Sequence, residues 1–259
     1  MFFFPFRDDN PTHAKPLISY ILLGLCVMIF FWQISLGMAQ RDAILAYGMV
    51  PARLFGLEAA YGLPNAIPAW MTTISSMFLH GGFMHLAGNM LYLWIFADNV
   101  EDSIGRGKFI VFYVLCGIAA ALTQALVDVH SAVPMIGASG AIAGVLGAYL
   151  LLHPRANIRC LVGFFVFFRT VNVPAFLVLG GWLVLQFMSL GQVDSGVAYL
   201  AHIGGFMAGM ALIPFFKKPH IRLFDRPHSR AFEVTPVRGG GHIPQIKSAP
   251  KKRNGPWDK

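Results

Sequence analysis

Two residues that could form a catalytic pair lie inside apolar segments of the chain. Ser139 is the one hydroxyl in a run of glycines and alanines, and His202 lies in another apolar run. A serine hydroxyl is a weak nucleophile until a base removes its proton, and histidine, whose unperturbed pKa is about 6.5, is a suitable base. Because no Asp or Glu lies within a predicted span, the sequence predicts a serine–histidine dyad instead of a triad with a carboxylate.

A third apolar segment supplies two further polar side chains, His85 and Asn89. Residues four apart lie on the same face of a helix, so both side chains are expected to point the same way. Acyl transfer requires hydrogen-bond donors aimed at the developing oxyanion. His85 and Asn89 can provide side-chain N–H groups, and the backbone N–H of Ser139 at a helix N-terminus can add a third donor.

Each of these residues also has a non-catalytic interpretation. Ser139 could cap a helix, and Asn89 could form a hydrogen bond between helices. The histidines at 80, 85 and 202 could bind a metal, but neither an HExxH motif nor a carboxylate accompanies them, so we expect no metal. The predicted depth of these side chains in the membrane and the helix faces on which they lie favour a shared catalytic role over separate structural roles.

The composition indicates a polytopic membrane protein. Of 259 residues, 56% are hydrophobic and 12% are charged, and the mean hydropathy is +0.60. Ordinary globular domains carry about 25% charged residues. The three cysteines, Cys26, Cys116 and Cys160, form no close pair in the sequence, so neither a disulfide framework nor a CxxC metal site is indicated.

The gaps between charged residues predict an all-α fold with six transmembrane helices, since about 20 apolar residues span a membrane. Residues 1–16 are then an N-terminal tail, 17–216 the six-helix domain, and 217–259 a C-terminal tail. Residues 38–69 are too long for a plain loop and are expected to associate with the membrane, whereas 160–168 are too short to cross and are expected to be interfacial. The predicted spans are 17–37, 71–96, 109–127, 139–152, 173–190 and 199–216.

The positions of lysine and arginine predict the orientation. All basic residues except Arg41 and Arg53 fall on one side, which should be the cytoplasm, so both termini are expected there. The basic, Pro- and Gly-rich residues 217–259 are expected to be disordered, as a tail that sets topology or as one that binds anionic lipid. Nucleic acid is not an expected partner, because topology accounts for the net charge of +8.

This orientation places the polar residues in one layer. The second, fourth and sixth spans then all run inward, so that Ser139, His202, His85 and Asn89 share a depth towards the extracytoplasmic face. Small residues follow Ser139 and His202 at helical spacing and form stripes along both spans. Such stripes let helices pack closely, which predicts that the Ser139 hydroxyl lies within hydrogen-bond reach of the His202 ring.

The chain resembles the rhomboid family of intramembrane serine proteases over about residues 68–212. The resemblance rests on several motifs in the family's order and spacing. These are His85-x-x-x-Asn89, Gly137-x-Ser139-Gly140, Ala201-His202, Glu101 with Gly105, Val173-Pro174-Ala175, and Trp182 with Gln186. One position departs from some members, which carry an aromatic residue that stacks on the catalytic histidine; here it is Ala143.

The resemblance implies the rhomboid six-helix fold with a cavity open to the extracytoplasmic side. It implies Ser139 as nucleophile, His202 as general base, and His85, Asn89 and backbone amides from Gly137 to Ser139 as the oxyanion site. Expected partners are membrane lipid and transmembrane protein substrates, which would be cut near their outer membrane boundary without a cofactor. The expected location is a bacterial inner membrane. A non-catalytic membrane chaperone or adaptor on the same fold is the alternative, and a transporter a more distant one.

Overall fold

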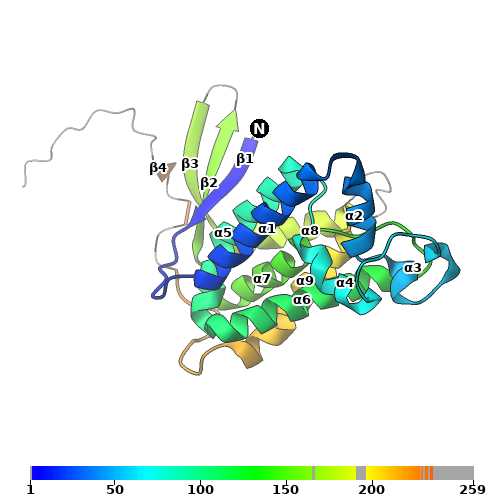
Figure 1. Cartoon of the computed structure of the whole chain (residues 1–259). Helices are drawn as coiled ribbons and strands as arrows, with labels where there is room; N and C mark the ends of the chain where they lie inside the picture. Colours follow the sequence, from blue (N-terminus) through cyan, green and yellow to red (C-terminus); the bar gives the residue numbers. More distant parts are fainter. Residues whose placement is uncertain are drawn as a thin grey trace, which may run out of the picture.

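Helix α7, Ser139–Leu152, lies at the centre of a helical bundle in the computed structural model (Figure 1). The structure describes residues 2–164, 167–190, 197–227, 229, 231–232 and 234–235. The other long helices among them are α1 Leu17–Ser35, α5 Phe83–Ile104, α6 Arg106–Val127, α8 Ala175–Met188 and α9 Tyr199–Phe216.

Small side chains allow α7 to occupy the centre. Every residue from 140 to 149 is buried, and the helix packs against α9, α6 and α5. A Cβ atom added to Gly144 would lie 3.1 Å from the carbonyl oxygen of Gly205 on α9, and one added to Gly140 would lie 2.6 Å from the Cβ atom of Ala120 on α6. The backbones therefore approach too closely for larger residues, which confirms the close packing that the glycine stripes predicted.

The bounds of α7 and α9 match the predicted fourth and sixth spans, and those of α1, α6 and α8 differ from prediction by at most three residues. Among the described residues, α1, α6 and α9 are long and apolar enough to cross a membrane. Helices α7 and α8 are apolar but shorter, and 14 residues of α7 extend about 21 Å. The count of six spans and the cytoplasmic placement of both termini stay predictions.

The bounds predicted for the second span, 71–96, are wrong. The chain first forms three short helical turns, η3 Ala69–Met71, α4 Thr72–Ser75 and η4 Ser76–Phe78. Helix α5 begins only at Phe83, after the pair Gly81-Gly82, and it continues to Ile104. Two consecutive glycines favour a break in a helix because their backbone is the most flexible of all residues.

Helix α5 continues through acidic residues, and one of them, Glu101, receives hydrogen bonds from the start of α1. The buried carboxylate of Glu101 accepts hydrogen bonds from the backbone N–H groups of Ile18, at 3.0 Å, and Ser19, at 2.8 Å, and from the Ser19 hydroxyl, at 2.7 Å. These N–H groups lie in the first turn of α1, where no intrahelical acceptor exists. A side chain of α5 therefore caps α1, which joins the two helices at this end.

The prediction of an all-α protein is wrong, because an antiparallel sheet of order β1-β2-β3-β4 stands beside the bundle (Figure 1). Residues 160–164 and 167–168, from the segment predicted to be interfacial, belong to the paired strands of a hairpin that extends past the arginines on both sides. In this hairpin Ile158 and Cys160 are buried while Arg159 between them is exposed, the alternation of a strand with one covered face. The strands are β1 Phe2–Asp8, β2 Asn157–Phe164, β3 Phe167–Pro174 and β4 Val234–Thr235.

Both predicted tails contribute to this folded end. Residues 1–16 include β1, which pairs with β2. After α9, the backbone N–H of Lys218 donates to the carbonyl of Ser103 at 2.9 Å, and that of Phe224 donates to Leu151 at 2.8 Å. The prediction of disorder from 217 onward is therefore wrong for this described part, and residues 236–259 lie outside the described residues.

The long first loop is built from short helices, η1 Gly37–Ala39, α2 Gln40–Tyr47, α3 Pro51–Leu54 and η2 Glu58–Ala60. Its fold is held by the guanidinium group of Arg53, which donates to the carbonyl oxygens of Leu45 and Pro64, each at 2.7 Å. Its association with a membrane stays a prediction.

Candidate active site

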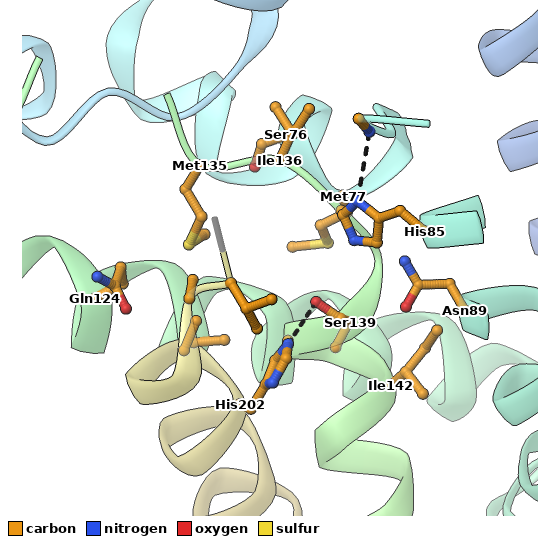
Figure 2. A pocket seen from close by; sticks show the side chains of 18 of the residues that line it. Ser76, Met77, His85, Asn89, Gln124, Met135, Ile136, Ser139, Ile142 and His202 are labelled. Carbon is orange, nitrogen blue, oxygen red and sulfur yellow. Dashed lines mark hydrogen bonds between the residues drawn. The ribbon is translucent and has the colours of Figure 1, made fainter. Parts of the chain in front are cut away.

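Ser139 and His202 meet where α7 and α9 begin. The Ser139 hydroxyl lies 2.8 Å from Nε2 of His202 (Figure 2). This distance confirms the proximity that the small-residue stripes predicted. The N-cap residue of α7 is Ala138, so the interpretation of Ser139 as the helix cap is wrong.

Helix α8 fixes the proton on the His202 ring. The side-chain N–H of Gln186 donates to the carbonyl oxygen of Trp182 at 3.2 Å, so its amide oxygen is the end that faces His202. That oxygen lies 2.7 Å from Nδ1 of His202, and an amide oxygen can only accept. Nδ1 therefore carries the proton, and the unprotonated Nε2 is free to accept the hydrogen of the Ser139 hydroxyl.

An aromatic side chain packs beside the ring. The centroid of Trp182 lies 5.7 Å from that of His202 with an interplanar angle of 35°, and Trp182 also stacks on Phe206. Tyr199 lies edge-on to the histidine at 6.5 Å. Helices α8 and α9 thus supply the aromatic contacts to His202 that the small side chain of Ala143 on α7 cannot provide.

His85 faces the same space from α5 (Figure 2). Its Nδ1 accepts a hydrogen bond from the backbone N–H of Gly81 at 3.4 Å, so the neutral ring carries its proton on Nε2. Gly137 packs directly against this nitrogen, because a Cβ atom on Gly137 would lie 2.8 Å from Nε2 of His85 and 3.6 Å from Oγ of Ser139. The N–H donor of His85 therefore points into the space beside the nucleophile.

The conformation of Gly137 is required by this turn. Its φ of +125° lies in the region that L side chains rarely adopt, and its N–H donates to the carbonyl oxygen of Ser76 at 2.8 Å. A side chain at this position would clash with His85 and would require a strained backbone conformation. Gly137 thereby fixes the chain immediately before α7 against His85.

Asn89 lies one helical turn after His85 and also faces Ser139 (Figure 2). The residue is buried, and its side-chain nitrogen has no hydrogen-bond partner among the described residues. A buried donor without an acceptor is costly, and such groups commonly serve a ligand or a reaction. Asn89 therefore offers an unused donor to anything bound beside Ser139.

A cavity of about 1240 Å³ joins these groups. Its lining contains all five of the residues predicted for the site, Gly137, Ser139, His202, His85 and Asn89. The first backbone hydrogen bond of α7 is donated by the N–H of Ile142 to the carbonyl oxygen of Ala138. The N–H of Ser139, three residues earlier, therefore has no acceptor within the helix. A carbonyl group bound in this cavity would meet one hydroxyl, two side-chain donors and a helix N-terminus.

Sequence reasoning did not identify the role of Gln186. Its resemblance to a family position was visible, but the orientation of the His202 ring was ascribed to packing and to unnamed polar neighbours. The signal that could have found it is one polar side chain in the apolar segment 175–188, on the same helix face as Trp182 four residues earlier.

These features define a helical membrane protein with a paired serine and histidine at the start of two central helices. Residues 68–219 match the family model described as "Rhomboid domain", which is more than half of the chain. The chain belongs to the rhomboid family and is an integral membrane protein.

Several relatives carry protease names. Rhomboid protease GluP of Bacillus subtilis is 29% identical over 76% of this chain and 34% of its own length. Rhomboid protein 1, mitochondrial, of Saccharomyces cerevisiae is 30% identical over 77% of this chain and 53% of its own length. Putative rhomboid protease YdcA of Bacillus subtilis is 26% identical over 76% of this chain and 86% of its own length. The chain thus spans only a third to a half of the first two relatives.

Proposed function

We propose that this protein is an intramembrane serine endopeptidase with a catalytic dyad of Ser139 and His202. The observation that carries the proposal is the hydrogen-bonded chain from Ser139 through His202 to Gln186, with distances of 2.8 and 2.7 Å. A nucleophile held by a base that is itself oriented by a third group is the common arrangement of nucleophilic catalysis. The family membership and the protease names of relatives support the same reaction class.

In the first half of the reaction, Oγ of Ser139 forms a bond to the carbonyl carbon of the scissile peptide while its proton passes to Nε2 of His202. The carbonyl electron pair moves onto oxygen, where Nε2–H of His85, the amide of Asn89 and the N–H of Ser139 stabilise the charge. Collapse of this intermediate breaks the C–N bond, and His202 gives its proton to the departing amine. Water then hydrolyses the acyl-enzyme by the same steps, with His202 as its base.

The substrates we propose are transmembrane proteins, cut near the extracytoplasmic boundary of the membrane. Two features support this assignment. The cavity opens among helices of a membrane-embedded bundle, and the distribution of basic residues supports an extracytoplasmic position for the start of α7. The bacterial inner membrane and the six-span topology with both termini in the cytoplasm belong to the same proposal.

A fluorophosphonate probe tests the proposal, because it reacts with an activated serine and needs no known substrate. The purified protein should be labelled at Ser139, while Ser139→Ala and His202→Ala should not be. Gel shift and peptide mass spectrometry identify the site. Folded wild-type protein that stays unlabelled and cleaves no model transmembrane substrate would favour the non-catalytic chaperone or adaptor.

A further inference from the structure

Two arginines of like charge face one another across the sheet at the end of the molecule remote from Ser139. Arg7 of β1 and Arg159 of β2 are cross-strand partners, so their side chains lie on the same face. Both residues are exposed, and no ion pair involves either one within the described part of the chain. Like charges directly opposite in a sheet destabilise it. A bound anion would remove this repulsion.

Both arginines line a cavity of about 710 Å³ between β1 and the adjacent ends of α1 and α5. The cavity also contains carboxylates, but the protein's own donors already engage them. Asp8 accepts hydrogen bonds from Tyr149 and from Asn99, each at 2.8 Å, and Asp9 accepts from the backbone N–H of Asn157 at 2.7 Å.

The third carboxylate of the cavity, Asp98, accepts from the backbone N–H of Asn99 at 2.7 Å. The two guanidinium groups have no such partners among the described residues. The charged groups of this lining that have no such partner are therefore the two guanidinium groups, although three carboxylates line the same cavity.

The wall of the cavity continues onto the exposed surface of α1 and α5. Tyr20 of α1 and Trp94 of α5 line it and stack on one another with ring centroids 5.7 Å apart. They are 47% and 57% exposed, and Phe6 of β1, also exposed, lies in the same lining. Aromatic side chains of this kind gather at membrane interfaces, where one end of the ring meets lipid and the other meets water.

We propose that Arg7 and Arg159 bind the phosphate of an anionic phospholipid, with its glycerol and upper acyl chains against Tyr20 and Trp94. Guanidinium groups bind phosphate oxygens in a bidentate manner, and two of them favour a headgroup with net negative charge over a zwitterionic one. The lipid would join β1, α1, α5 and β2. Since β3 leads directly into α8, the bound lipid also supports the helix that carries Gln186. This binding site does not depend on the proposed peptidase activity.

Equilibrium binding in detergent micelles tests the site, with fluorescent dioleoyl phosphatidylglycerol as the probe and unlabelled phosphatidylglycerol, phosphatidylcholine or inorganic phosphate as competitors. Arg7→Gln/Arg159→Gln should lose at least about tenfold in affinity for the probe, because a charge-assisted hydrogen bond contributes roughly a factor of ten or more. Arg155→Gln is the matched control. It removes an exposed arginine a few residues before β2 that does not line the cavity, and it should bind as wild type does.

Loss of binding in the double variant, retention in the control, and weak competition by phosphatidylcholine and by phosphate would support the lipid site. Unchanged binding by Arg7→Gln/Arg159→Gln would overturn it, and so would equal competition by phosphatidylcholine. Full displacement by inorganic phosphate at the same phosphorus concentration would instead assign the site to soluble anions. If the double variant does not fold, Arg159→Gln alone should still weaken binding severalfold relative to Arg155→Gln.

Discussion

The amide oxygen of Gln186 lies 2.7 Å from Nδ1 of His202 and thereby determines which ring nitrogen faces Ser139. Because Nδ1 must donate to this oxygen, Nε2 is left as the acceptor for the serine hydroxyl. A neutral amide on α8 thus performs the orienting task that a carboxylate performs in a triad.

Gln186→Leu should therefore lower kcat by roughly tenfold to a hundredfold with little change in KM, because a misoriented base weakens a transition-state interaction. Gln186→Glu keeps an acceptor at Nδ1 and should retain more activity than Gln186→Leu. Equal activities for the two variants would mean that Gln186 only fills space.

The oxyanion role proposed for Asn89 can be separated from a structural one by experiment. A single donor typically contributes about 10²–10³ in kcat, but His85 and the backbone N–H of Ser139 remain in Asn89→Ala, so we expect a fall of roughly tenfold to a hundredfold. His85→Ala should be at least as severe. Thermal unfolding and kcat should be measured on the same detergent preparation. A destabilised Asn89→Ala enzyme with near-normal kcat would remove Asn89 from the site.

Gly137→Ala should impair both folding and catalysis. The added Cβ atom would lie 2.8 Å from His85 and would sit at a φ of +125°. Gly88→Ala is the control, because Gly88 also lines the cavity but an added Cβ atom there meets nothing within 4 Å. We expect Gly88→Ala to be neutral or stabilising by about 0.5–1 kcal/mol, as for Gly replaced within a helix. Similar effects of the two substitutions on kcat and unfolding temperature would contradict the packing of Gly137 on His85.

The sheet end of the molecule should respond to pH through Asp8. Burial is the main cause that raises the pKa of this carboxyl to about 7, and the hydrogen bond from Tyr149 opposes it only in part. An unfolded Asp titrates at about 3.9, so the folded state binds this proton more tightly. The contribution of Asp8 to stability is thus fully present below about pH 4 and is lost as pH rises through about 7.

Asp8→Asn keeps the side chain neutral at every pH and should remove this dependence. The midpoint of thermal unfolding should fall between about pH 4 and about pH 7 for the wild type and change less for Asp8→Asn, which should be the more stable protein at pH 8. Parallel profiles for the two proteins would show that Asp8 does not titrate in this range.

The predicted orientation can be tested by cysteine labelling with a membrane-impermeant reagent in intact cells. Ser131→Cys, in the loop before α7, should react from outside, and Arg155→Cys, in the turn after α7, should not. The native cysteines give little background because Cys26, Cys116 and Cys160 are all buried. The reverse labelling pattern would place Ser139 towards the cytoplasm and contradict the charge-based topology.

Helices α7 and α9 were predictable because their signals are local, whereas the start of α5 was not. Charged residues bound the apolar segments of α7 and α9, and the glycines along both helices indicated that they pack closely enough to join Ser139 and His202. With small side chains along the facing sides of α7 and α9, the two helices pack closely, and this brings Ser139 and His202 together. Even the layer shared by the four polar residues followed from the direction of each span.

The sheet could not be predicted in the same way, because β1 and β2 lie about 150 residues apart in the chain. Residues 160–168 are too few for a transmembrane helix, and the arginines on either side concealed the continuation of both strands past them. The task of Gln186 was hidden for a related reason. The sequence of α8 alone does not indicate which of its faces contacts His202, because that contact depends on how α8 packs against α9.

The central claim is that Ser139 and His202 act as one catalytic unit, and the most direct test is the cleavage rate of a model transmembrane substrate in proteoliposomes. Ser139→Ala, His202→Ala and the double variant should each lose essentially all turnover, and the double variant should be no worse than either single one, because members of a unit are not additive. All three should unfold near the wild-type temperature. Substantial cleavage by folded Ser139→Ala would contradict the account.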